Sequence, residues 1–141
     1  MDRAALDAAI EFNYPIGGWC PKNRLAEDGE IPHSYPLMET PSQDYLQRTE
    51  WNVRDSQGTL IIAYANLSGG TAATKEFAIQ YRRPVLIVNL NEEPHIQEMK
   101  DWLEANKIKI LNIAGPREST PPGIYQQAKV ILELLFQSMQ V

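Results

Sequence analysis

The sequence has little of several features that mark particular classes of protein. It contains a single cysteine, Cys20, so no disulfide can form within the chain and an oxidising compartment is not indicated. Its net charge is −5, with no basic stripe of the kind that binds nucleic acid. Its longest apolar runs, 60–65 and 85–88, are much shorter than the roughly 20 residues of a membrane span. We therefore expect a cytoplasmic protein with neither a nucleic-acid nor a membrane partner.

What the sequence does contain is typical of one globular domain. Its 141 residues are 43% hydrophobic and 22% charged, which is close to the average for soluble domains. Its two histidines, His33 and His95, are far apart and neither has a second histidine or cysteine at metal-ligand spacing, so no metal site is predicted. We expect residues 1–141 to form a single ligand-binding domain.

The order of hydrophobic patterns predicts alternating strands and helices. Near-continuous apolar runs, typical of strands buried on both faces of a parallel sheet, occupy 59–64, 84–89 and 108–113. Helical periodicity marks the segments 2–12, 71–81, 94–106 and 122–139. This alternation predicts an α/β fold, with a three-layer α/β/α, Rossmann-like, doubly wound and mainly parallel sheet.

The region before the first apolar run is less regular. Ile16 to Cys20 is expected to be a short buried strand, and 21–41, which has four prolines, is expected to be a long loop acting as a lid over a ligand. Ser42 is the expected N-cap of a further helix. Two cations of the loop, Lys22 and Arg24, are candidates to hold an anionic ligand, although solvated loop charges are the simpler alternative.

The most informative local pattern is the turn Ser68-Gly69-Gly70-Thr71, which joins a predicted strand to a predicted helix. In parallel sheets ligands bind beyond the carboxyl ends of strands, where free N–H groups and the helix dipole favour an anion. The hydroxyls of Ser68, Thr71 and Thr74 would add donors. The pattern predicts a site for a phosphorylated small molecule, with a simple tight turn as the alternative.

Two further residues are candidates on chemical grounds. Glu76 lies in the predicted helix after the glycine turn. It is a candidate general acid or base, or a candidate acceptor for a ribose hydroxyl, with a solvated helix charge as the alternative. Asn52, next to Trp51, is a candidate to bond a base or a pterin ring on which the tryptophan stacks, although a helical tryptophan is more often part of a core.

The segment 67–76, Leu-Ser-Gly-Gly-Thr-Ala-Ala-Thr-Lys-Glu, resembles the Pro-Gly-Gly-x-Gly-Thr-x-x-Glu motif of the LOG-type, lysine-decarboxylase-like nucleotide-binding superfamily. Gly69, Gly70 and Glu76 stay in register, while the third glycine of the motif is replaced. The resemblance implies, as one alternative, a nucleotide or nucleoside-phosphate hydrolase that pairs Glu76 with an upstream arginine, either Arg48 or Arg54.

A closer resemblance covers most of the chain. It rests on Asp-Arg-Ala-Ala-Leu-Asp at 2–7, Gly-Gly-Trp-Cys-Pro-Lys at 17–22, Ala-Glu-Asp-Gly at 26–29, Tyr-Pro-Leu at 35–37, Glu-Thr at 39–40 and Arg-Thr-Glu-Trp-Asn-Val-Arg-Asp at 48–55. Together these segments resemble the putative molybdenum carrier family, a circularly permuted branch of the same superfamily, related to molybdenum-cofactor carriers. The resemblance implies a molybdopterin-type cofactor or a nucleotide as ligand, and a homo-oligomer, either a dimer or a tetramer.

One departure from that family concerns the start of the sequence. Members normally begin with a strand and a Ser-Gly-Gly-Gln-Thr-Gly turn just before the segment that resembles 2–7. The resemblance therefore implies that the sheet lacks its first strand, through a start codon assigned too far downstream or a truncated form of the protein.

Overall fold

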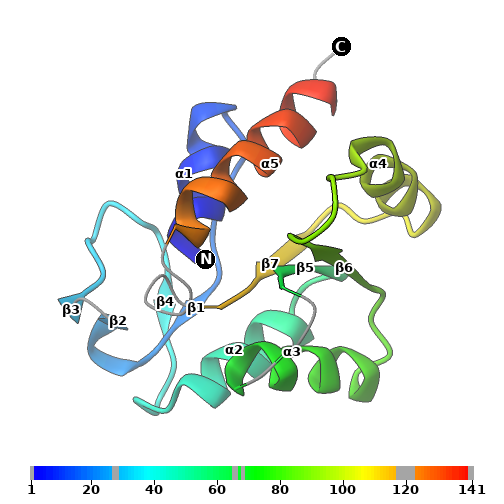
Figure 1. Ribbon diagram of the computed structural model, residues 1–141. Helices are drawn as coiled ribbons and strands as arrows, with labels where there is room; N and C mark the ends of the chain where they lie inside the picture. Colours follow the sequence, from blue (N-terminus) through cyan, green and yellow to red (C-terminus); the bar gives the residue numbers. More distant parts are fainter. Residues whose placement is uncertain (1, 27–28, 65–66, 68, 117–122, 140–141) are drawn as a thin grey trace.

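A computed structural model describes residues 2–26, 29–64, 67, 69–116 and 123–139 (Figure 1). Its main sheet has the strand order β6-β5-β7, with β5 (Gly58–Ala63) between β6 (Val85–Asn89) and β7 (Leu111–Ala114), and both pairings are parallel. All of β5 is buried, as expected for an apolar run covered on both faces. The three apolar runs of the sequence therefore form the three strands of this sheet.

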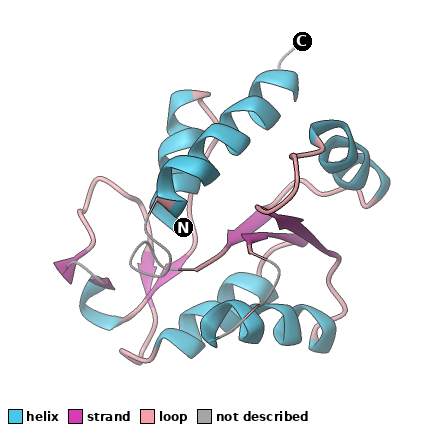
Figure 2. Ribbon diagram, in the orientation of Figure 1, coloured by secondary structure: helices cyan, strands magenta, loops and turns pink. Residues whose placement is uncertain are grey.

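Helices cover both faces of the sheet. Figure 2 shows α2 (Tyr45–Arg54) and α3 (Gly69–Gln80) together on one side, and α1 (Asp2–Glu11), α4 (Ile96–Ala105) and α5 (Ile124–Met139) on the other. This arrangement confirms the predicted three-layer α/β/α fold. Within the described parts of the chain, no helix has both the length and the apolar character needed to cross a membrane.

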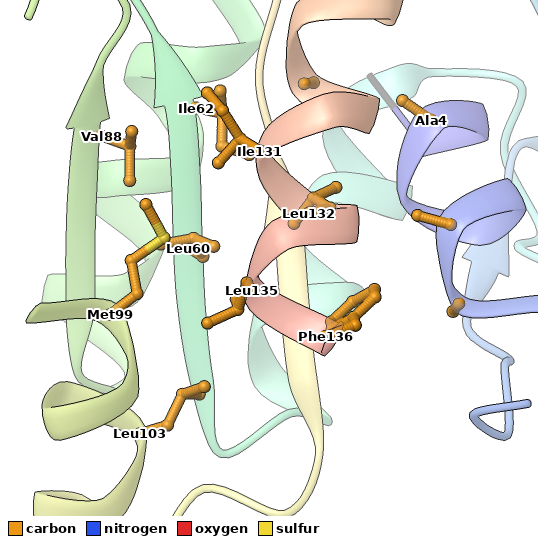
Figure 3. Close-up of a cluster of buried hydrophobic side chains, with 13 residues drawn as sticks. Ala4, Leu60, Ile62, Val88, Met99, Leu103, Ile131, Leu132, Leu135 and Phe136 are labelled. Atoms are coloured by element: carbon orange, nitrogen blue, oxygen red, sulfur yellow. The ribbon is translucent and has the colours of Figure 1, made fainter. Parts of the chain in front are cut away.

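The main core lies between the sheet and the layer formed by α1, α4 and α5. Figure 3 shows Leu60 and Ile62 of β5 facing Leu132 and Leu135 of α5, with Met99 of α4 beside them. The three central leucines and Ile62 are at most 1% exposed. Burying a side chain of this size contributes about 1.5–3 kcal/mol, so this layer holds α5 firmly to β5.

Small residues let α1 approach α5 closely. Ala4 and Ala8 of α1 are fully buried, while Phe136 of α5 packs against Phe12 and Tyr14 just beyond the end of α1. Alanine also has the highest helix propensity, so the same residues favour the helix and shape its packing face. The predicted N-terminal helix is thereby confirmed, and its position above the edge of the sheet is established.

The segment 21–41, expected to be a long loop, contains several short elements. The helical turn η1 (Lys22–Arg24) is followed by β2 (Leu25–Ala26), which pairs antiparallel with β3 (Gly29–Glu30). The expected strand at 16–20 is reduced to β1 (Trp19–Cys20), which pairs in parallel with β4 (Met38–Glu39). Gly17 and Gly18 are exposed, so the prediction of a buried strand over the whole of 16–20 was wrong.

Arg24 holds this loop together. Its side chain is only 5% exposed and donates hydrogen bonds to the carbonyl oxygens of Ile31, Pro32, Tyr35 and Leu37, at 2.7–3.1 Å. The fork of donors on a guanidinium suits several acceptors at once, which an ammonium group does not. Arg24, predicted as a candidate to hold an anionic ligand with a solvated charge as the alternative, thus lies at the centre of the fold of this loop.

Two predicted boundaries differ from the structure for local reasons. Asp44, and not Ser42, is the N-cap of α2, because its Oδ1 accepts from the Leu46 N–H at 2.9 Å, while Ser42 Oγ accepts from the Asp44 N–H. The last strand begins at Leu111 and not at 108, because the Ile110 N–H donates to the side chain of Gln57 at 2.9 Å and not to a strand. In both places a side-chain oxygen accepts a hydrogen bond from a backbone N–H group and so sets the end of the element.

Candidate functional site

The glycine turn predicted from the sequence lies at the start of α3, directly after the central strand. Gly69 and Gly70 are the first two residues of α3, and both are exposed. A Cβ atom added at either position would meet nothing within 4 Å, so the space beside them is open. Because the first N–H groups of a helix have no partner within it, this end presents donors to that open space.

Gly69 has a backbone conformation that favours glycine. Its φ angle is +53°, in the left-handed region, where a residue with a side chain is disfavoured. The conformation turns the chain sharply into α3. The geometry of the turn therefore favours glycine here, whether or not a ligand binds.

The two threonines of the predicted site face the protein. Thr71 and Thr74 are 7% and 3% exposed, and the Thr74 hydroxyl donates to the carbonyl of Gly70 at 2.8 Å. The proton of that hydroxyl is used within the helix, so Thr74 supports the first turn of α3. Ser68, and the segment 117–120 that also follows a strand, lie outside the described residues.

A carboxylate with two tyrosine partners links three separate segments. Asp7 of α1 accepts from the Tyr35 hydroxyl at 2.6 Å through one oxygen and from the Tyr125 hydroxyl of α5 through the other. The hydrogen bond to Asp7 raises the pKa of Tyr125 to about 12 and also raises the pKa of Tyr35. Sequence patterning missed this cluster because its members are far apart along the chain.

The candidate arginines of a hydrolase have other partners in the structure. Arg48 lies over the ring of Tyr45, 5.5 Å from its centroid, and Arg54 lies over Trp51 at 4.7 Å while its Nε donates to Asp55 at 2.8 Å. Glu76 is exposed on α3. In the parts of the chain that the structure describes, no ion pair joins Glu76 to either arginine.

Asn52, predicted to bond a ring of the ligand, bonds the backbone of Trp19 instead. Its Oδ1 accepts from the Trp19 N–H at 2.8 Å, and its Nδ2 donates to the Trp19 carbonyl at 3.1 Å. Trp19 also donates a hydrogen bond from Nε1 to Asp55. The hydrogen bonds from Arg54 and Trp19 hold the pKa of the Asp55 carboxyl below its usual range. Asn52 thus fixes β1 against α2, and Trp51 packs edge-on against Trp19.

The remaining predicted residue, Lys22, is exposed in η1, where its N–H donates to the Ser42 carbonyl at 3.0 Å. The predicted site residues therefore lie on three different elements, η1, α2 and α3. Among the described residues, no hydrogen bond or ion pair joins Lys22 or Asn52 to the start of α3. Of the predicted residues that the structure describes, Gly69, Gly70 and Thr71 are consecutive at the start of α3.

A large cavity lies elsewhere and was not foreseen from the sequence. It has a volume of about 900 Å³ and runs along β7, between that strand and the segment 14–19, with α1 and α5 also contributing to its wall. Most of its lining is apolar. Among the described residues, no cluster of three or more histidine, cysteine or acidic side chains is placed to hold a metal ion.

Comparison with known proteins agrees with this architecture. One similar solved structure is the 1.45 Å crystal structure of a protein from Syntrophus aciditrophicus SB named "Putative molybdenum carrier protein". That protein is 47% identical in sequence to this chain, and the two structures superpose with a TM-score of 0.90. The match covers 95% of this chain and 87% of that one. A search of curated proteins found no match. The model of the circularly permutated YpsA SLOG family matches residues 1–136, and the chain therefore belongs to this family.

Proposed function

We propose that this protein is a molybdenum carrier-like protein that binds a phosphorylated small molecule at the start of α3. The observation that carries the proposal is the pair Gly69–Gly70, exposed at the first turn of a helix that follows the central parallel strand. Similarity to a protein named as a molybdenum carrier, at 47% identity, supports the choice of cargo. In this proposal molybdenum is carried as part of the ligand and is not a resident metal of the protein.

The chemistry of this helix end suits a phosphate group. Anions are stabilised at a helix N-terminus by the unpaired N–H groups and by the positive end of the helix dipole. Because Gly70 has no side chain and open space beside it, a phosphate oxygen can come within hydrogen-bonding distance of the backbone. Thr74 stabilises this turn by bonding Gly70, so the donors are held in place before a ligand arrives.

The experiment compares two substitutions with the same change of charge on the same helix. Gly70→Glu places a carboxylate in the open space beside the first turn, while Gln80→Glu adds the same charge at the exposed other end of α3. Binding of inorganic phosphate, AMP, molybdate and molybdopterin is measured by titration calorimetry. We expect Gly70→Glu to weaken binding of the phosphorylated probes at least about tenfold, and Gln80→Glu to leave it unchanged.

The separate probes distinguish the parts of the proposal. If the protein binds molybdopterin and Gly70→Glu weakens that binding, the carrier is supported. Binding of molybdate alone, with no response to phosphate or molybdopterin, contradicts the phosphate site. If the protein hydrolyses AMP and Glu76→Gln abolishes that hydrolysis, the carrier is contradicted and the hydrolase that the motif also suggested is supported.

A further inference from the structure

The outer side of β6 is an unpaired edge of the main sheet. Figure 3 shows the strand of Val88 at the end of the sheet, beside the strand of Leu60, and β5 is its partner in the strand order. The Thr59 N–H donates to the Pro84 carbonyl at 3.0 Å, so Pro84 and every second residue after it direct their backbone groups to β5. The groups of the residues between them point outward.

The outward groups belong to Val85, Ile87 and Asn89. Within the described part of the chain, no hydrogen bond is found to the backbone N–H or C=O of Val85 or Ile87. The Asn89 carbonyl accepts from the Glu92 N–H at 3.1 Å, and a carbonyl oxygen can accept a second hydrogen bond. All three residues can therefore pair with a further strand.

This edge lacks the features that usually protect an edge strand. Natural edges are kept very short, bulged, covered, or interrupted by lysine or proline. The strand β6 pairs with β5 in unbroken register over all five of its residues, Val-Leu-Ile-Val-Asn, and contains neither lysine nor proline. The other end of the sheet differs, because the cavity beside β7 is walled by 14–19. Of the two edges, β6 is the one that a second sheet can approach.

Two exposed isoleucines lie along the same margin of the molecule. Because Leu86 and Val88 face the core under α4 and α5, Ile87 points to the opposite face, and it is 38% exposed. Ile79, near the end of α3, is 64% exposed. Tyr81 bonds α2, and residues two apart point about 200° apart around a helix, so Ile79 points away from α2. Since α3 also packs on β6, that flank adjoins the free edge.

The two ends of β6 carry opposite charges. Arg82 and Arg83 are exposed just before the strand, and Glu92 and Glu93 are exposed just after it. A hollow of about 100 Å³ lies between the end of β6 and the start of α4, and Glu98 lines it together with the other two glutamates. Among the residues that the structure describes, no ion pair involves Arg82 or any of these glutamates. The edge is therefore cationic at one end and acidic at the other.

We propose that the outer edge of β6 pairs antiparallel with the same edge of a second copy, so that one sheet continues across a symmetric dimer. A two-fold axis beside Ile87 lets the Ile87 residues of the two copies exchange both backbone hydrogen bonds, and it sets Val85 opposite Asn89. The same axis brings the arginines before one strand to the glutamates after the other. The edge is thus complementary to itself, which selects a second copy as the occupant.

This pairing also covers the apolar margin. Directly opposed side chains of an antiparallel pair lie on the same face of the sheet, so the two Ile87 side chains contact each other. Ile79 lies at the opposite end of α3 from Gly69 and Gly70, so the dimer leaves the start of that helix open. The interface therefore does not depend on the proposed ligand site.

The first test reverses charge at the two ends of the edge in the 141-residue chain. Arg82→Glu and Glu92→Arg each place like charges together in the dimer, while the double variant restores opposite pairs. Lys107→Glu is the control, because Lys107 is exposed after a helix, as Arg82 is, with a φ angle of 52° against 54°. The dimer Kd is measured by analytical ultracentrifugation, and amide hydrogen exchange is followed at Val85 and Ile87.

The second test removes a backbone donor from the edge. Ile87→Pro deletes an outward N–H, while the bonds to β5, which Leu86 and Val88 make, are kept. Circular dichroism shows whether this variant is folded. If it does not fold, the charge variants decide the outcome.

We expect wild type to form a dimer with slow exchange at Val85 and Ile87. Each single charge reversal should raise the dimer Kd at least about tenfold, and the double variant should return to within about threefold of wild type. Lys107→Glu should leave the Kd unchanged, and folded Ile87→Pro should be monomeric. Wild type that stays monomeric at its highest soluble concentration would overturn the proposal. A dimer whose Kd is the same in both single charge variants would also overturn it. These readouts need no ligand, so their failure is separate from failure of the proposed function.

Discussion

The hydroxyl of Tyr125 donates a hydrogen bond to the carboxylate of Asp7, across 118 positions of the chain. The bond joins the first turn of α5 to the middle of α1. Tyr35 donates to the other oxygen of the same carboxylate, at 2.6 Å, and so connects the segment before β4 to both helices. A single acidic side chain thereby connects three segments that lie far apart along the chain.

Replacing Tyr125 by phenylalanine is expected to lower the free energy of unfolding by about 1–2 kcal/mol, because a hydrogen bond to a charged, partly buried acceptor is lost. The folded-state pKa of about 12 lies above the usual value of 10. The contribution is therefore complete below pH 10 and is lost as pH rises towards 12. Urea unfolding of both proteins at pH 8 and pH 11 measures it.

The matched control for that experiment is Tyr64→Phe. The Tyr64 hydroxyl donates to the neutral side chain of Gln127 at 3.0 Å, so its loss is expected to cost less, about 0.5–1 kcal/mol. If wild type and Tyr125→Phe differ in the free energy of unfolding by as much at pH 11 as at pH 8, the bond to Asp7 is not the source of that difference.

Arg24→Lys is expected to destabilise the protein by about 2–3 kcal/mol, because one ammonium cannot reach the four carbonyls that the guanidinium serves. The loop should also become sensitive to limited proteolysis. Lys22→Met, at an exposed neighbouring position, is the control and is expected to stay within about 0.5 kcal/mol of wild type. Unchanged stability of Arg24→Lys together with weaker ligand binding would instead support the role predicted from the sequence.

Gly58→Ala is expected to cost about 1–3 kcal/mol through overpacking. A Cβ at this first position of β5 would collide with the side chain of Ile108 and lie 3.3 Å from the ring of Trp102. Gly17→Ala, where a Cβ would meet nothing within 4 Å, is the control. Thermal unfolding separates the two, and equal Tm values would show that Ile108 moves aside freely.

Asp55 is expected to make stability depend on pH on the acid side. Its hydrogen bonds from Arg54 and Trp19 lower its pKa, so its contribution is present above the pKa of the unfolded chain and is lost as pH falls through the lowered value. Because both side chains of the ion pair are about 40% exposed or more, Asp55→Asn should cost only about 0.5 kcal/mol at pH 7 and nothing at pH 2–3. Glu104→Gln, on the exposed face of α4, is the control in a thermal titration.

The elements that sequence patterning predicted correctly are those with strong local signals. The apolar runs that became β5, β6 and β7 are recognisable from their composition alone, but burial on both faces, expected for all three, holds only for the central strand β5, because β6 and β7 lie outside it in the described sheet. The β1–β4 pair could not be predicted, because each strand is two residues long and no local pattern reveals the hydrogen bonds by which Arg24 holds the intervening loop. The phosphate site at Gly69 and Gly70 stays a prediction.

The predicted arginine and asparagine ligands illustrate a different limit. Sequence patterning shows that Arg24 and Asn52 carry hydrogen-bonding groups but not where their partners lie. In the structure those partners are backbone groups more than six positions away, at Ile31 and Trp19. A polar side chain near a predicted site is therefore weak evidence of ligand contact until the backbone around it is known.

The two hydrogen bonds between Asn52 and Trp19 also bear on how this protein behaves at high concentration. An unpaired strand edge is a template on which other chains can add and aggregate. At Trp19 a side-chain amide occupies both backbone groups in place of a neighbouring strand. Among the described strands β7 pairs only with β5, and no such side chain is seen to cover its outer edge, so any unwanted assembly of the chain should begin at β7 and not at β1.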